Sequence, residues 1–171
     1  GSWALRAYEG GFGSFYSPDV FTDYPPGYIY ILYPIGAMLH HLKLNMLSPV
    51  GLILLKLPSI LSDLGAAYLI YRFASRSFNE ATALLLSALY AFNPAVLINS
   101  VVWGQVDSIL VFLVFLFCLT MTEGKTIPAY FIFAAGVLLK PQMLVFAPLL
   151  LYGIYEFEFL KFRDLKSFLM H

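Results

Sequence analysis

The feature that most constrains the fold is a succession of long apolar runs, separated by short polar or proline-containing turns. Hydrophobic residues make up 60% of the 171 residues and charged residues 12%, whereas soluble domains carry about 25% charged residues. Inside a bilayer the backbone must satisfy its own hydrogen bonds, and helices do so. The sequence therefore predicts an all-α, polytopic transmembrane helix bundle. The apolar runs cover residues 26–42, 50–71, 81–102, 106–121, 127–139 and 142–155.

The basic residues predict an orientation, because short cytoplasmic loops carry an excess of Lys and Arg. If residues 56–73 cross inward, all the later basic segments fall on the cytoplasmic side. About five spans result, and residues 26–42, which are short for a span, form a juxtamembrane or re-entrant helix on the external side. In the alternative, residues 26–42 are a full span and only the first loop moves inside. The basic residues used here are Arg72, Arg76, Lys125, Lys161, Arg163 and Lys166.

This topology divides the chain into three parts. Residues 1–49 form an external loop with the juxtamembrane helix. The glycine-rich segment 1–25 lies outside the hydrocarbon, with a short surface helix at residues 3–8. Residues 50–155 form the transmembrane bundle. Residues 156–171 form a charged, amphipathic tail that lies along the cytoplasmic surface of the membrane.

A proline motif, Asp23-Tyr24-Pro25-Pro26-Gly27-Tyr28, precedes the first apolar run. Pro26 fits the first turn of a helix, where its missing N–H costs nothing. The Asp23 carboxylate then stands near the positive end of that helix dipole, where an anion is favoured. Two interpretations follow: Asp23 takes part in chemistry at the membrane surface, or it only caps the helix.

Two charged residues interrupt the next apolar run. Lys56 and Asp63 are seven residues apart, close to two helical turns, so both lie on one helix face with Ser59 between them. Charged side chains in a membrane helix face a cavity or a partner. Alternatively, Lys56 extends to the lipid headgroups and Asp63 pairs with another helix.

Two further polar motifs fall at the same predicted face of the membrane. Trp103-Gly104-Gln105-Val106-Asp107-Ser108 combines an aromatic ring, an amide and a carboxylate, although helix capping alone accounts for Asp107. Lys140-Pro141-Gln142 is either a tight turn or a fixed cation and amide directed at a phosphate. The predicted orientation brings all these motifs to the external side, and such convergence is what a site requires.

Other classes of function find little support in the residues. Net charge is zero and no basic run occurs, so nucleic acid is not an expected partner. His40 and His41 lack a third ligand at metal spacing, and Cys118 lies within an apolar run, so we predict no metal site. A transporter that uses Lys56 and Asp63 as an ion pair is the weakest interpretation, since no inverted repeat is visible.

Four motifs occur in order along the chain: the segment from Trp3 to Tyr28, Lys56-Leu57-Pro58-Ser59, Trp103 to Ser108, and Lys140-Pro141-Gln142. Together they resemble the motifs of polytopic GT-C glycosyltransferases. The resemblance covers nearly the whole chain and is nearest to the mannosyltransferase-like branch. It implies a polyprenyl-phosphate sugar as donor and transfer on the external or luminal face. The catalytic acid that follows the first helix of such enzymes has no counterpart here, so we expect the chain to be a fragment or a reduced relative that lacks that helix and the C-terminal part.

The resulting functional prediction is an integral membrane protein of the cell or inner membrane that transfers a hexose, mannose being the candidate, to an acceptor on the external or periplasmic side. The alternative is a catalytically inactive subunit that packs in a larger membrane complex. Expected partners are membrane lipids, the donor lipid and, for the alternative, other membrane subunits; the need for a divalent metal stays open. Asp23 is the candidate catalytic residue. The candidate substrate-binding residues are Tyr24, Lys56, Asp63, Trp103, Gln105, Asp107, Lys140 and Gln142.

Overall fold

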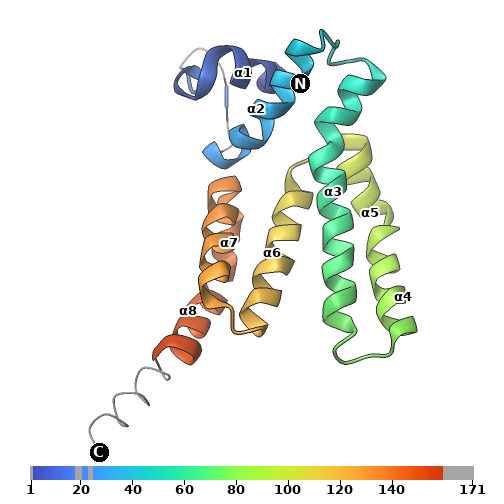
Figure 1. The fold of residues 1–171 in the computed structure, drawn as a ribbon, viewed down its shortest axis with the longest axis vertical. Coiled ribbons are helices and arrows are strands. Elements are labelled where there is room, and N and C mark those ends of the chain that lie inside the picture. Colours follow the sequence, from blue (N-terminus) through green and yellow to red (C-terminus); the bar gives the residue numbers. More distant parts are fainter. Residues whose placement is uncertain (1, 18–20, 23–24, 160–171) are drawn as a thin grey trace, which may run out of the picture.

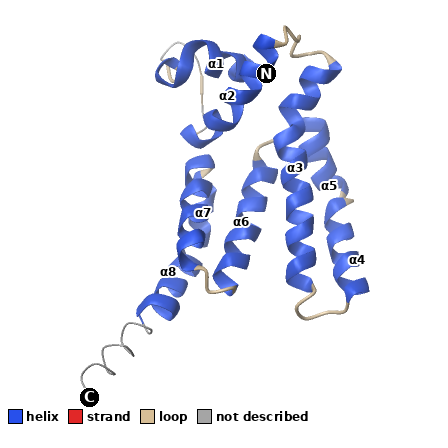
Figure 2. Cartoon of the chain, in the orientation of Figure 1, coloured by secondary structure: helices blue, strands red, loops and turns tan. Residues whose placement is uncertain are grey.

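A computed structural model describes residues 2–17, 21–22 and 25–159, and these residues form helices and connecting turns without a strand (Figures 1 and 2). The predicted all-α class is therefore confirmed. The α-helices are α1 (Ser2–Ser14), α2 (Pro26–His41), α3 (Pro49–Ala74), α4 (Glu80–Ala91), α5 (Pro94–Leu97), α6 (Asp107–Thr122), α7 (Thr126–Leu139) and α8 (Ala147–Gly153). A π-helix η1 (Ile98–Trp103), a 3-10 helix η2 (Pro141–Phe146) and a π-helix η3 (Ile154–Phe159) complete the list.

Local sequence signals explain where these helices begin. Pro26, Pro49, Pro94 and Pro141 each occupy a first-turn position, where no backbone N–H is needed. Side-chain caps accompany several of them. The Ser48 hydroxyl accepts from the Gly51 N–H at 3.1 Å, the Asn79 carbonyl accepts from Thr82 at 2.9 Å and the Asn93 carbonyl accepts from Ala95 at 2.9 Å.

The long helices pack side by side, and the two N-terminal helices cover one end of them. α3 contacts α4 and α6, and α6 contacts α7. Figure 1 shows α1 and α2 together at one end, above α7, while the turns α3–α4 and α6–α7 lie at the opposite end. α1 and α2 pack so closely that a Cβ at Gly36 would lie 1.9 Å from the Ala4 carbonyl oxygen. Only glycine fits at this crossing.

One described helix, α3, has the length and apolar composition of a membrane span. α4 and the segment Pro94–Trp103 together pass the same test, but they are bent by 44° at their break. α6, with 16 residues, and α7, with 14, are apolar but shorter than the roughly twenty residues that cross a bilayer. The structure therefore supports one or two spans within its described part, and the predicted five-span bundle is not confirmed.

The N-terminal segment contains a longer helix than the one predicted at residues 3–8. The helix α1 runs from Ser2 to Ser14 and contains a kink at Gly11, where φ is 69°. Packing explains the difference: Ala4 and Ala7 are fully buried against α2, and that contact overrides the low helix propensity of a glycine-rich stretch. Residues 160–171 of the predicted tail lie outside the described residues, and η3 precedes them.

Candidate functional site

The beginning of α2, the beginning of α6 and the end of α7 meet at one point of the fold. A Cβ added to Gly27 would lie 2.6 Å from the Leu138 carbonyl, so the first turn of α2 presses directly on the α7 backbone. Beneath this contact Val106, Ile109 and Leu139 form a buried apolar cluster, with Tyr28 packed against it. The end of the proline motif at Gly27 and Tyr28, the Trp103–Ser108 motif and the Lys140 motif are thus neighbours in space.

Lys140 and Asp107 form an ion pair across this junction, with the Lys140 ammonium donating to the Asp107 carboxylate. The Lys140 side chain is 18% exposed and that of Asp107 is 39% exposed. Lys140 follows the last turn of α7 and Asp107 opens α6, so each charge sits at the helix end whose dipole favours it. The structure therefore joins two predicted site residues that are 33 positions apart in sequence.

Lys56 supports the turn that carries Trp103. Its ammonium donates to the carbonyl oxygens of Val101 at 2.7 Å and Val102 at 3.0 Å, at the end of η1. Gly104 then adopts φ of 73°, and a Cβ at that position would lie 3.0 Å from the Lys56 Cγ. These contacts fix the backbone just before Asp107.

Ser59 holds the same turn one helical turn further along α3. Its hydroxyl donates to the Gln105 carbonyl at 2.7 Å. The N–H groups of Gly104 and Gln105 both donate to the Asn99 carbonyl, at 2.9 and 3.0 Å. The turn is consequently built from backbone groups whose partners all lie in α3 or η1, which favours one rigid arrangement.

A cavity of about 360 Å³ opens beside Lys56. Apolar side chains of α2 and α3 form much of its wall, and the Lys56 side chain contributes a cation. Trp103 borders it and is 73% exposed, so its ring offers an open aromatic face. A hollow that combines apolar side chains, polar groups, a cation and an aromatic ring suits an amphipathic anion. The lining includes Trp3, Tyr28, Leu52, Lys56, Trp103 and Gly104.

Asp63 is buried, with 8% of its surface exposed, and both of its carboxylate oxygens are used. The Tyr90 hydroxyl donates to one oxygen at 3.2 Å and the Ser108 hydroxyl donates to the other at 3.1 Å. Asn99 in turn donates to the Ser108 hydroxyl at 3.4 Å. Asp63 therefore ties α3 to α4 and α6.

Asp63 also borders a smaller cavity of about 210 Å³ together with Asn99 and Asp107. Its predicted substrate contact stays a prediction. The sequence analysis did not identify Tyr90, because little distinguishes it from the other tyrosines of the chain, which has 12 in all. Its position one turn before the Asn93-Pro94 break is the only local signal.

The remaining predicted residues are less closely connected to this site. Gln142 is exposed in η2, two residues after Lys140. Gln105 is half-buried and its contact with α3 is made by the backbone. Asp23 and Tyr24 lie outside the described residues. Pro25, the residue after Tyr24, begins the described segment that leads to the Gly27–Leu138 contact.

No group of three or more metal-ligating side chains occurs among the residues that the structure describes. His40 and His41, at the end of α2, have partners in α1 instead. His40 lies 3.4 Å from the Glu9 carboxylate, and the ring nitrogen of His41 is 2.8 Å from the Tyr8 hydroxyl. The two histidines help to hold α1 against α2.

Comparison with known proteins adds one finding. The model of glycosyltransferase family 87 matches residues 21–153, which contain the proline motif, α3, the Trp103–Ser108 turn and Lys140. No curated protein matches the chain, and no solved structure does. The matched segment includes every described residue of the junction between α2, α6 and α7. The chain belongs to glycosyltransferase family 87, a GT-C-like family of membrane glycosyltransferases.

Proposed function

We propose that this membrane glycosyltransferase transfers a hexose from a polyprenyl-phosphate sugar to an acceptor hydroxyl on the external face of the membrane. The observation that carries the proposal is the partly buried Lys140–Asp107 pair at the junction of α2, α6 and α7. It provides a cation for the donor phosphate and a carboxylate for the acceptor or the sugar, side by side.

Two lysines suit the donor phosphate. Lys140 is held at the end of α7, and a phosphate oxygen competes with Asp107 for its ammonium. Lys56 uses two of its three N–H donors on the carbonyls of Val101 and Val102, so one donor is left for a phosphate oxygen. A fixed cation stabilises the negative charge that develops on the leaving phosphate.

The transfer is a substitution at the anomeric carbon. The acceptor oxygen forms a bond to that carbon, while the bond from the carbon to the phosphate oxygen breaks and its electron pair leaves with the polyprenyl phosphate. The acceptor proton passes to a carboxylate acting as a general base. Asp23 remains our candidate for that base, supported by the contact of the neighbouring Gly27 with α7 beside Lys140. Asp107 is the second candidate.

The sugar and its lipid fit the cavity beside Lys56, which shares Tyr28 with the junction. The exposed ring of Trp103 provides a flat surface for a hexose, and the amides of Gln105 and Gln142, with Tyr24 and Asp63, are candidates for its hydroxyl groups. The apolar side chains in the wall of the 360 Å³ cavity, Leu32, Leu52 and Leu55, suit the first units of a polyprenyl chain. Mannose as the hexose rests on the sequence resemblance to the mannosyltransferase-like branch.

The external side of the membrane is inferred from charge. Arg72, Arg76 and Lys125 all pair with Glu123. The α3–α4 and α6–α7 turns, in or beside which these residues lie, are at the end of the bundle opposite α1 and α2 (Figure 1), and short basic loops favour the cytoplasm. The family match favours an enzyme over the catalytically inactive subunit. Whether transfer needs a divalent metal is tested by running the assay with and without a divalent cation.

The test is transfer of labelled mannose by the purified protein in liposomes, with a membrane-lipid extract as acceptor and with or without a divalent cation. We expect transfer from polyprenyl-phosphate mannose and none from a nucleotide-linked mannose. Lys140→Gln lowers kcat/KM by about 100-fold or more, the loss expected when one preorganised electrostatic group is removed. Lys43→Gln, an exposed lysine in the turn after α2, is the control and retains wild-type transfer. Full activity of Lys140→Gln, or transfer from the nucleotide donor alone, would contradict the proposal.

A further inference from the structure

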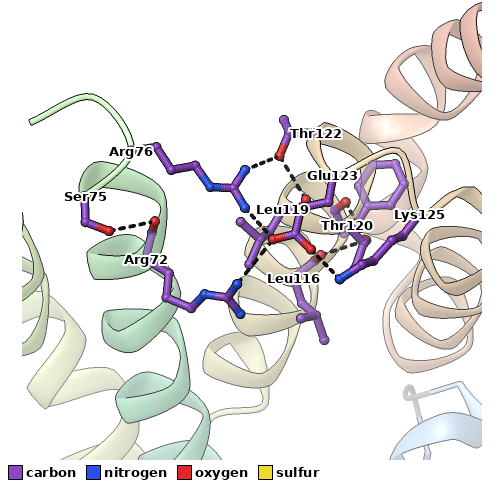
Figure 3. Close-up of polar contacts among 10 residues, drawn as sticks. Arg72, Ser75, Arg76, Leu116, Leu119, Thr120, Thr122, Glu123 and Lys125 are labelled. Carbon is purple, nitrogen blue, oxygen red and sulfur yellow. Dashed lines mark hydrogen bonds and ion pairs between the residues drawn. The ribbon is translucent and has the colours of Figure 1, made fainter.

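A second charged cluster lies where the end of α3 meets the turn between α6 and α7 (Figure 3). The Glu123 carboxylate, in the turn between α6 and α7, accepts from Arg72 at 3.3 Å, from Arg76 and from Lys125 at 2.7 Å. Arg76 also donates to the Thr122 hydroxyl at 3.2 Å. Figure 3 shows the two arginines reaching from α3 and the turn after it toward the end of α6.

This cluster carries more positive charge than its own carboxylate neutralises. The hydrogen bond from Lys125, followed by the charges of Lys125, Arg76 and Arg72, lowers the pKa of the Glu123 carboxyl, so that group is ionised. Three cations then surround one anion. The surplus of two positive charges has no further acidic partner among the ion pairs of the described residues. An arginine fork presents its donors in the geometry that phosphate oxygens match.

An apolar cavity of about 510 Å³ opens beside the cluster, between α3, α4 and α6. Its wall is formed in part by residues that are close to the charged ones in the chain. Phe73 and Phe78 line it and flank Arg76 in sequence, and Leu119, which also lines it, accepts the backbone N–H of Glu123 at 3.0 Å. A phosphate at the cluster would therefore have an apolar hollow close by.

We propose that this end of the protein binds an anionic phospholipid, with the phosphodiester on Arg72 and Arg76 and an acyl chain in the cavity lined by Phe73, Phe78 and Leu119. Charge selects the headgroup: the surplus of two positive charges favours a lipid with net negative charge over a zwitterionic one. The cavity selects a chain-bearing phosphate over a free one. This site is separate from the donor site and does not depend on the proposed function.

The test is lipid binding by the full chain, measured by native mass spectrometry from detergent with phosphatidylglycerol and phosphatidylcholine of equal chain length. The wild type retains phosphatidylglycerol preferentially. Each basic residue near an anionic headgroup is worth about 1 kcal/mol, or about fivefold in affinity, so Arg72→Gln/Arg76→Gln lowers phosphatidylglycerol affinity about 25-fold. Phosphatidylcholine affinity falls less, because that lipid has the phosphodiester but no net negative charge. Lys43→Gln, which removes a lysine outside the cluster, leaves both affinities unchanged.

Two further variants separate binding from folding. Arg72→Lys/Arg76→Lys keeps the charges and retains most of the preference for phosphatidylglycerol. Glu123→Gln removes the competing anion and tightens phosphatidylglycerol binding about fivefold. Inorganic phosphate at the lipid's concentration does not displace the lipid, because it lacks the acyl chain. Equal retention of both lipids by the wild type, displacement by inorganic phosphate, or unchanged binding in Glu123→Gln would overturn the proposal.

Discussion

Gly27→Ala is the substitution that most directly disturbs the junction without removing a polar group. The new Cβ would lie 2.6 Å from the Leu138 carbonyl and 2.8 Å from the Leu139 N, whereas ordinary contacts begin at 3.4 Å. Both neighbours are backbone atoms, so no side chain can rotate away. The start of α2 must then move from α7 by about 0.8 Å, the difference between these distances.

That movement has two measurable consequences. Overpacking costs about 1–3 kcal/mol, which outweighs the gain of about 1 kcal/mol that alanine brings to a helix, so the melting temperature falls. The shift also separates the proline motif from Lys140, and a misplacement near 1 Å costs about 100-fold in rate. We therefore expect kcat/KM for mannose transfer to fall by about 10- to 100-fold.

The control is Gly13→Ala in α1, because a Cβ at Gly13 meets no atom within 4 Å. It keeps wild-type transfer and a melting temperature equal to or above that of the wild type. The assays are thermal unfolding in detergent and the liposome transfer assay. Wild-type stability and activity of Gly27→Ala would refute the close contact between α2 and α7 as a determinant of the site.

Two other substitutions test the turns at the two ends of the bundle. Gly104→Ala forces alanine into a left-handed conformation against Lys56 and lowers the free energy of unfolding by about 1–2 kcal/mol. Gly104→Asn lowers it less, because asparagine adopts that conformation more readily. Equal losses for the two variants in chemical denaturation would contradict this. The pKa of the Glu123 carboxyl is lower in the folded protein than its ordinary value of 4.5. Its ionised form therefore stabilises the fold fully above that ordinary value, and this stabilisation is lost as pH falls through the lower pKa of the folded state. Melting temperature should therefore fall on acidification in the wild type and less so in Glu123→Gln; parallel curves would contradict it.

The apolar runs predicted the helices well, because their ends carry strong local signals. The predicted runs 106–121 and 127–139 correspond to α6 (Asp107–Thr122) and α7 (Thr126–Leu139). The predicted run 81–102 is divided at Asn93-Pro94 into α4 and α5, followed by η1. The extent of α1 was not predictable from its composition. It depends on the contact between Ala4 and Gly36, which are far apart in sequence.

The site was predictable as a set of polar motifs but not as a set of contacts. Charge patterning brought Lys140 and Asp107 to one face, yet their pairing depends on how α6 packs on α7. The link from Asp63 to Tyr90 likewise depends on the packing of α3 against α4. Such pairs are set by tertiary packing, which apolar periodicity does not specify.

The central claim is that the donor phosphate binds at the junction of α2, α6 and α7. A photoreactive polyprenyl-phosphate analogue, crosslinked to the protein in liposomes and mapped by peptide mass spectrometry, tests it most directly. We predict adducts at Trp103 and on the peptides that contain Lys56 and Lys140, all of which excess polyprenyl-phosphate mannose displaces. Displaceable adducts confined to the Arg72–Glu123 end of the bundle would contradict it.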